Sequence, residues 1–252
     1  MQTSTKRIAW ITGGGSGIGQ ALALRLVREG WTVAVSGRRR EALQETARLA
    51  TASVHAYPLD VGDLAAMRQA AAHIESELGP IGLVVLNAGF GRFVKLDNLR
   101  AETFANHMRV NYLGVVNGID AVLAYFRKRR AGHIVIVASV AGYRGLPSTA
   151  AYGPTKAALI NLAESLYFDL QREGILISIC NPGFVRTPMT AENRAPMPFL
   201  MNLTDATEAL YSGIMQQKFE IAFPRRFVLL LKLFRCLPYA LYFPVMRKFT
   251  GR

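Results

Sequence analysis

A cluster of glycines near the start of the chain separates a short apolar run from an amphipathic one. Residues 8–11 are apolar, the turn reads Thr12-Gly13-Gly14-Gly15-Ser16-Gly17-Ile18-Gly19, and residues 20–30 have helical periodicity that ends at Gly30. This order of strand, glycines and helix lets the backbone approach a pyrophosphate held at the helix N-terminus. The spacing is T-G-x-x-x-G-x-G and not the common G-x-G-x-x-G. A turn without a ligand is the alternative, but the position favours a binding site.

Predicted strands and helices alternate along the chain. Further apolar runs lie at 31–36, 54–59, 83–86, 133–138 and 175–180, and helical composition lies at 41–50, 63–78, 101–130 and 148–172. Strands without polar alternation suit a parallel sheet that is covered on both faces. The pattern therefore predicts one doubly wound α/β domain, with ligands at the carboxyl ends of its strands.

Composition excludes several classes of protein. The chain has 252 residues, of which 51% are hydrophobic and 19% charged, so it can bury a full core and is not disordered. Two cysteines and four scattered histidines predict neither a disulfide scaffold nor a metal site, and favour a reducing, intracellular setting. No secretory signal or spanning segment is visible, so we expect a cytoplasmic location.

The net charge of +13 suggests an anionic partner, which could be nucleic acid, a membrane surface or a phosphate-rich ligand. The alternative is that the excess of Lys and Arg only keeps the protein soluble.

Further motifs follow the glycine turn in a fixed order. They are Asp60, Asn87-Ala88-Gly89, Asn111, Ser139, Tyr152-x-x-x-Lys156 and Pro182-Gly183. With the turn, they resemble the classical short-chain dehydrogenase/reductase family over roughly residues 6–224. The resemblance implies a Rossmann-type domain over residues 1–224, with a mostly parallel seven-stranded sheet in the order 3-2-1-4-5-6-7 flanked by helices. It also implies a nicotinamide cofactor, carbonyl/alcohol redox chemistry, and a homodimer or homotetramer.

The end of the second predicted strand bears on the choice of cofactor. NAD enzymes usually place an acidic residue there, on the adenosine ribose. This chain has Gly37 followed by three arginines, Arg38 to Arg40. Because a guanidinium can pair bidentately with a 2′-phosphate, we predict NADP(H), with Arg38 as the first candidate and Arg39 as the second. Arg40 is better explained as the solvated start of the next helix.

Tyr152 and Lys156 are four residues apart on a predicted helix and therefore share a face. A neighbouring ammonium stabilises phenolate and would lower the pKa of the tyrosine from about 10. The resemblance implies that Tyr152 exchanges a proton with the substrate oxygen and that Lys156 tunes Tyr152 and binds the nicotinamide ribose. It also implies that Ser139 holds the substrate oxygen and that Asn111 positions a relay water, although Asn111 alone could be an ordinary polar helix residue.

The resemblance also assigns cofactor contacts to residues spread along the chain. These are Thr12, Gly13, Ser16, Gly17, Ile18, Gly19, Asp60, Val61, Asn87, Ala88, Gly89, Pro182, Gly183, Val185 and Thr187, beside Arg38, Arg39, Tyr152 and Lys156. Asp60 and Val61 would contact adenine, Asn87 would tie the fourth strand to its neighbours, and Thr187 would bond the carboxamide.

Residues 189–203 stand where the family carries its substrate lid, and they are rich in Met, Pro, Phe and Leu. An apolar lid favours a lipophilic carbonyl or alcohol as substrate, whereas packing of the lid on its own domain is an equal alternative. Phe90, Phe93 and Val94 are further candidates to line the same cleft.

Residues 225–252 form a basic, apolar C-terminal extension with seven Lys or Arg and no acidic residue. Residues 227–237 suit a helix, and Pro238 and Pro244 divide the region. Aromatic residues among cations suit a helix in a membrane interface, so peripheral membrane contact is the first interpretation. Completion of the substrate pocket and a dimer interface are the alternatives, and nucleic acid is not expected.

The sequence thus predicts an NADPH-dependent oxidoreductase. A non-catalytic NADPH sensor or a membrane-associated scaffold on the same fold is the alternative.

Overall fold

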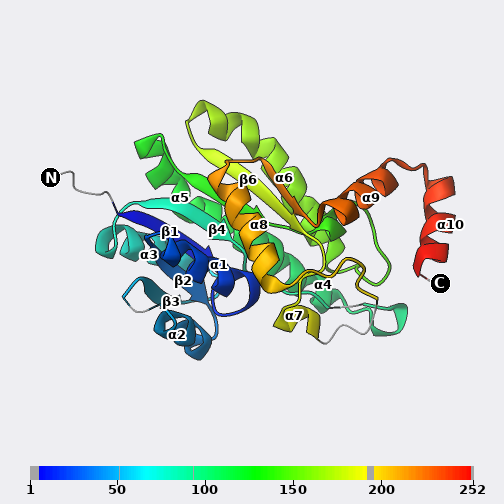
Figure 1. Ribbon diagram of the computed structural model, residues 1–252, viewed down its shortest axis with the longest axis horizontal. Helices are drawn as coiled ribbons and strands as arrows, with labels where there is room; N and C mark the ends of the chain where they lie inside the picture. Colours follow the sequence, from blue (N-terminus) through cyan, green and yellow to red (C-terminus); the bar gives the residue numbers. More distant parts are fainter. Residues whose placement is uncertain (1–5, 51, 93, 192–195, 251–252) are drawn as a thin grey trace.

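The computed structural model describes residues 6–50, 52–92, 94–191 and 196–250. Figure 1 shows a central sheet with helices on both of its faces. The strands are β1 (Arg7–Thr12), β2 (Trp31–Gly37), β3 (Val54–Pro58), β4 (Ile81–Leu86), β5 (His133–Val137), β6 (Leu176–Pro182) and β7 (Glu220–Phe223). They form one seven-stranded sheet in the order β3-β2-β1-β4-β5-β6-β7, and every neighbouring pair is parallel. The predicted fold class and strand order are confirmed.

The α-helices are α1 (Gly17–Arg28), α2 (Arg40–Arg48), α3 (Leu64–Glu77), α4 (Ala101–His107), α5 (Gly114–Arg129), α6 (Gly153–Arg172), α7 (Pro188–Ala191), α8 (Leu203–Met215), α9 (Arg225–Cys236) and α10 (Tyr239–Thr250). Short 3₁₀ turns lie at η1 (Leu96–Asn98) and η3 (Val140–Gly142), and a π-helical turn lies at η2 (Met108–Leu113).

Four elements differ from the sequence-based expectation. The π-helical turn interrupts the helix predicted over residues 101–130. Helix α8 and strand β7 lie in residues 203–223, where hydrophobic periodicity assigned no element. Pro238 separates α9 from α10 as expected, but Pro244 lies inside α10, which continues around it with one backbone donor fewer.

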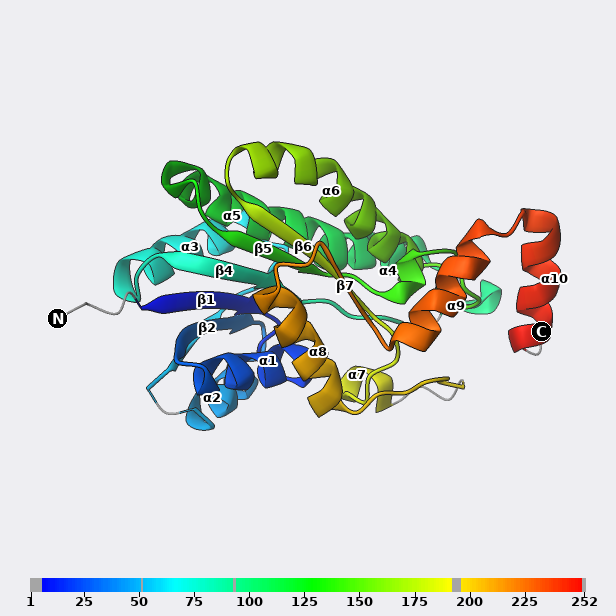
Figure 2. The same cartoon turned by 45° about the horizontal axis from the view of Figure 1, so that its top comes forward.

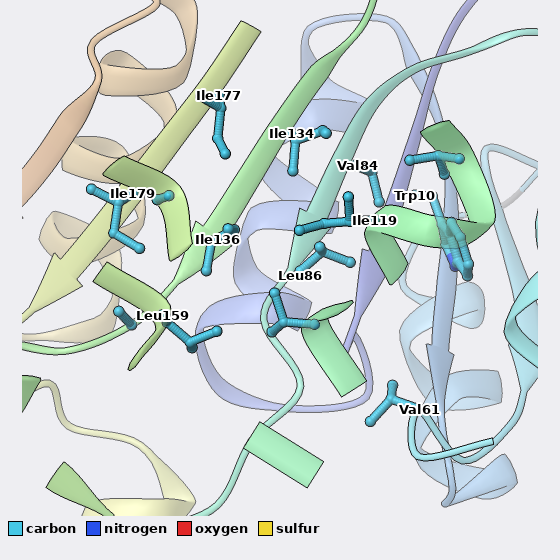
Figure 3. Packing of buried hydrophobic residues seen from close by; sticks show 14 of the residues in the cluster. Trp10, Val61, Val84, Leu86, Ile119, Ile134, Ile136, Leu159, Ile177 and Ile179 are labelled. Carbon is cyan, nitrogen blue, oxygen red and sulfur yellow. The ribbon is translucent and has the colours of Figure 1, made fainter. Parts of the chain in front are cut away.

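The core lies on both faces of the sheet. In β5, Ile134 and Ile136 point to one cluster, while Val135 and Val137 point to the other. Figure 3 shows the first cluster, where these isoleucines meet side chains of β6, of α6 and, through Ile119, of α5. The second cluster is closed by α1, α2 and α8. Side chains alternate along a strand, so burial on both faces explains why the strands read as continuous apolar runs.

The loops that follow β1, β4, β5 and β6 gather at one edge of the sheet, because parallel strands end at the same edge. Both views place α9 and α10 at one end of the molecule, far from the start of β1 (Figures 1 and 2). Across the described residues, none of the helices combines the length and the apolar character that crossing a membrane requires.

Candidate active site

The glycine turn connects β1 to α1 with a backbone that favours glycine. Gly13 and Gly17 have φ of +70° and +56°. Ser16, just before α1, is extended and its side chain makes no capping hydrogen bond, so it leaves the N–H groups of the first turn to another acceptor. A Cβ built on Gly17 would lie 3.5 Å from Thr187, so the turn faces the loop after β6. These features fit a bound pyrophosphate.

Thr12 and Asn87 join the turn to β4. The Thr12 hydroxyl accepts hydrogen bonds from the backbone N–H groups of Asn87 and Ala88, at 3.0 and 3.1 Å. The Asn87 amide donates to the Thr12 carbonyl at 3.0 Å. Asn87 therefore ties the fourth strand to the first, as expected. Gly13 and Gly19 pack against this amide, while Ile18 is partly buried on the second core cluster.

Two arginines stand beside the turn, at the end of β2. Arg39 donates from Nη2 to the Ser16 hydroxyl at 3.1 Å, which places its guanidinium at the N-terminus of α1. Arg38 is exposed, and its positive charge is close enough to help lower the pKa of the Asp60 carboxyl. The last residue of β2 is Gly37, which has no side-chain carboxylate at the end of this strand.

Asp60 follows β3 and is held by neighbours that favour its charged form. Its Oδ1 accepts from the Gly62 N–H at 2.9 Å, and its Oδ2 accepts two hydrogen bonds from Arg109, both at 3.1 Å. Partial burial raises the pKa of this carboxyl, but the Gly62 N–H and the Arg109 and Arg38 guanidinium groups outweigh burial and hold the pKa below its usual value. Arg109 was not singled out by the sequence motifs. Val61 is buried in the first core cluster.

Tyr152 and Lys156 lie at the start of α6. Tyr152 is the residue directly before the helix. Its ring packs against Gly91: a Cβ added to Gly91 would lie only 3.2 Å from Tyr152 Cδ2. Lys156 is buried, its Nζ donates to the Val137 carbonyl at 2.9 Å, and the same atom lies 5.6 Å from the centre of the Tyr152 ring. The predicted pairing of the two side chains is therefore observed.

The ionisation of this pair differs from the prediction. Burial raises the pKa of Tyr152, against an opposing hydrogen bond with Ser139. Burial also lowers the pKa of Lys156 to about 8. The pKa shift of the phenol is therefore opposite to the predicted lowering, because desolvation of the hydroxyl outweighs the opposing hydrogen bond with Ser139.

Ser139 and Asn111 approach the same place from two other elements. Ser139 precedes η3, and its hydroxyl accepts from the Ala141 N–H at 3.1 Å. The Asn111 side-chain amide donates to the Phe90 carbonyl at 2.9 Å and accepts from the Phe90 N–H at 3.0 Å. It also donates to the Thr155 hydroxyl at 3.2 Å. The π-helical turn shifts the register of the helix and so turns this amide toward α6.

Gly89 lies between two of these groups. A Cβ on Gly89 would come within 3.2 Å of Asn111 Oδ1 and 3.5 Å of Lys156 Nζ. The structure therefore brings the four predicted catalytic residues to one edge of the sheet.

The loop after β6 carries the remaining predicted residues. Pro182 ends the strand, and the Gly183 N–H donates to the Phe223 carbonyl at 2.7 Å. Val185 is buried and pairs with Met201 at the end of the lid. The Thr187 N–H donates at 3.0 Å to Thr190, a residue that the motifs did not indicate, although Thr at this position is an ordinary turn signal.

Aromatic rings connect this loop, the lid and α9. Phe227 of α9 stacks on Phe184 and on Phe199 of the lid, with ring centres 5.7 Å apart in both pairs. The sequence assigned Phe227 to the extension, and no local pattern indicates its contact with the lid. Residues 192–195 of the lid, and Phe93 of the predicted cleft, lie outside the described residues.

A polar cluster centres on Glu220. Glu220 of β7 accepts from the Tyr143 hydroxyl at 2.6 Å and from the Asn181 amide at 3.1 Å, and pairs with Lys232 of α9. Partial burial raises the pKa of Glu220, but its three partners outweigh burial and hold it below the usual value. These residues are far apart in the sequence, so no motif contains them.

This chain is similar to known oxidoreductases along most of its length. The family model for short chain dehydrogenase matches residues 7–198. An "uncharacterized oxidoreductase" of Myxococcus xanthus is 36% identical over 251 residues, which are 98% of this chain and 99% of that protein. An "uncharacterized oxidoreductase" of Staphylococcus epidermidis is 32% identical over 185 residues, 73% of this chain and 80% of that protein.

A solved structure has the same fold. It is a short chain dehydrogenase/reductase from Burkholderia phymatum in complex with NAD, with a TM-score of 0.83 and 27% identity, covering 92% of this chain and 94% of that one. The family model spans more than half of the chain and the Myxococcus protein matches nearly all of it, so this protein belongs to the short-chain dehydrogenase family of oxidoreductases.

Proposed function

We propose that the protein transfers hydride between NADP(H) and a carbonyl or alcohol of a lipophilic substrate, with Tyr152 as the acid or base. The observation that carries the proposal is the meeting of Tyr152, Lys156 and Ser139 at the sheet edge to which the glycine turn also opens. When bound, the nicotinamide would donate or accept the hydride. The chain's own residues would orient the substrate and move the proton.

Tyr152 and Ser139 would act on the substrate oxygen. Because burial raises the pKa of Tyr152, its hydroxyl stays protonated at neutral pH, which is the form that donates a proton to a carbonyl oxygen. Ser139 would hold the same oxygen and stabilise its developing charge. Lys156, fixed on the Val137 carbonyl, would supply positive charge as the phenolate forms and would bond the nicotinamide ribose.

Arg38 and Arg39 favour NADP(H) over NAD(H) in this proposal. Gly37 stands at the place where an NAD enzyme would present a carboxylate, Arg38 and Arg39 follow it directly, and Arg39 reaches the Ser16 hydroxyl at the start of α1. The Burkholderia structure contains NAD, which supports a nicotinamide cofactor in general. The specific choice rests on the two arginines.

The aromatic rings that join the lid to α9 support a lipophilic substrate. Phe184, Phe199 and Phe227 stack beside the loop that carries Thr187. Apolar substrate surface buried against them would contribute about 25 cal/mol per Å². A homodimer or homotetramer and a cytoplasmic location stay predictions.

The test is NADPH oxidation with ketones and aldehydes of graded chain length, comparing the wild-type protein with Tyr152→Phe. We expect turnover to rise with chain length and to fall by about 100-fold or more in the variant, since the proton donor is lost. NADPH affinity should change little. Tyr167→Phe, a change on the same helix outside the site, is the matched control.

Two outcomes would contradict the proposal. Tyr152→Phe turning over at the wild-type rate would remove Tyr152 from the reaction. NADPH binding without turnover of any carbonyl would favour the non-catalytic NADPH sensor instead.

A further inference from the structure

Helix α10 has little tertiary packing. Of its residues, Tyr242 and Met246 are buried, whereas large apolar side chains along it are exposed. They are Tyr239, Leu241, Phe243, Val245 and Phe249. On α9, Phe227, Val228 and Leu231 join the core, but Leu229 and Leu233, one turn apart, are 67% and 62% exposed. Together α9 and α10, the C-terminal helical pair, therefore present apolar surface to solvent.

Cations lie among these exposed apolar side chains. Arg225, Arg226, Arg235, Arg247 and Lys248 are exposed, and within the described ranges none of the five takes part in an ion pair. Residues 225–252 contain no Asp or Glu. The surface of the helical pair therefore carries one sign of charge, and its complement is an anionic partner.

The helical pair is fixed to the domain and does not trail from it. Arg144 donates to the carbonyls of Phe234, Arg235 and Leu237 at the end of α9, at 2.6, 3.0 and 2.6 Å. The Tyr242 hydroxyl donates to the Gly145 carbonyl at 2.6 Å. The pair projects beyond the sheet at one end of the molecule (Figure 2). It therefore offers a preformed surface that the other described residues leave uncovered.

We propose that the C-terminal helical pair docks on an anionic lipid bilayer. Each helix has 12 residues, which is too short to cross the hydrocarbon but suits a helix that lies in the interface. Leucine and aromatic side chains would enter the boundary between headgroups and acyl chains, and the arginines and lysine would pair with anionic headgroups.

A second copy of the chain fits this surface less well. In a symmetric dimer the same patch faces itself, which would bring the cations of two helical pairs together without a carboxylate from either. The rest of the chain is also basic, since the net charge is +13 and the helical pair holds only part of it. The bilayer is the partner that complements both the apolar and the basic side chains.

The experiment is flotation of the full chain with vesicles of phosphatidylcholine alone and with an equal share of phosphatidylglycerol. We expect flotation with the second composition only, weakened by high salt. Arg247→Gln/Lys248→Gln should lower the partition coefficient roughly 30-fold, because each cation near such a surface contributes about 1 kcal/mol. Leu233→Glu/Phe243→Glu should lower it at least as much.

Matched variants carry the same changes to distant surfaces. Lys128→Gln/Arg172→Gln removes the same charge, and Leu49→Glu/Phe168→Glu replaces two apolar side chains of similar exposure. Both should float like the wild-type protein, and sedimentation velocity without lipid reports the oligomeric state of every variant. Flotation that is absent, independent of phosphatidylglycerol, or unchanged in the helical-pair variants overturns the proposal. Unchanged flotation with an altered oligomeric state would assign the surface to a second copy.

Discussion

Lys156 brings a titratable amine into the interior of the protein. Only 3% of the residue is exposed, and its Nζ donates to one backbone carbonyl, that of Val137. Burial lowers its pKa to about 8. Below that pH the folded state holds a charged amine that water no longer solvates well, so this buried amine should reduce the stability of the folded state.

The sign of the pH dependence follows from the lowered pKa. Between about pH 8 and the ordinary value near 10.5, the unfolded chain binds the proton and the folded chain does not, so stability rises with pH. At pH 7 the amine is charged in both states, and burial costs about 3 kcal/mol at 1.36 kcal/mol for each pH unit of the lowering.

We therefore expect Lys156→Met to raise the free energy of unfolding at pH 7 by about 1–2 kcal/mol, after the lost hydrogen bond to Val137 is allowed for. Urea unfolding at pH 7 and at pH 9.5 measures this, and the advantage of the variant should shrink at the higher pH. Lys128→Met, on the exposed face of α5, should show neither effect. A variant less stable than the wild-type protein at pH 7 would contradict the expected cost of burying the charge.

The sequence predicted that the candidate site residues Tyr152 and Lys156 lie together, but it did not predict the direction of their ionisation. Tyr152 and Lys156 are recognisable from their spacing, and the structure places them together. The direction of the pKa shift of Tyr152 depends on how many protein atoms surround its hydroxyl, which is a property of the packed loop and not of the motif. The hydrogen bonds between Asp60 and Arg109 and between Asn111 and Phe90 also join residues that are far apart in the sequence, so no local motif contains them.

At the scale of elements, periodicity identified the strands that are buried on both faces and missed the short edge strand β7. Strand β7 reads Glu-Ile-Ala-Phe and is fully buried at only two of its four positions, so it is not a continuous apolar run like the central strands; it takes its place by pairing with β6 and packing under α8. The π-helical turn was missed for a related reason. A single shifted turn leaves composition unchanged, while it decides where Asn111 points.

Arg144 holds the end of α9 to the loop that follows Ser139. Its guanidinium meets three carbonyls at the C-terminus of that helix, where the helix dipole also favours a cation. The same group lies over the rings of Tyr242 and Tyr239, 3.9 and 4.9 Å from their centres. One side chain therefore links the sheet edge that carries Ser139 to both C-terminal helices.

We expect Arg144→Met to loosen the helical pair while the sheet keeps its stability. Loss of these charge-assisted bonds corresponds to about 1–3 kcal/mol of local opening free energy, so amide hydrogen exchange in α9 and α10 should speed up by about 5-fold to 150-fold. Exchange in β4 and β5 should not change. Arg172→Met, which replaces an exposed arginine of α6, is the control. Unchanged protection of α9 and α10 would mean that the buried face of α9 alone fixes the pair.

At the scale of the whole molecule, the proposed cofactor site joins parts of the chain that are far apart in sequence. The glycine turn, the end of β2 and the loop after β6 contribute to it, and Gly17 faces Thr187 across the gap between them. A ligand that contacts all three holds the two halves of the sheet together. Because it binds the folded chain and not the unfolded chain, it raises the apparent stability by mass action.

The two cofactors should therefore differ as stabilisers. At a free concentration about 100 times its Kd, NADPH should add about 2.7 kcal/mol. For a chain of this size this corresponds to a rise in Tm of about 5–10 °C. NADH lacks the 2′-phosphate. If loss of the 2′-phosphate contacts makes NADH bind about 100-fold more weakly, NADH at the same concentration should raise Tm by only about 1 °C.

In Arg38→Ala/Arg39→Ala the two Tm shifts should become equal, because the guanidinium groups that would distinguish the cofactors are gone. Arg40→Ala, at the first residue of α2, should keep the difference. A larger shift with NADH than with NADPH in the wild-type protein would show that the two arginines do not select the phosphate, and would leave the glycine turn as the main determinant of binding.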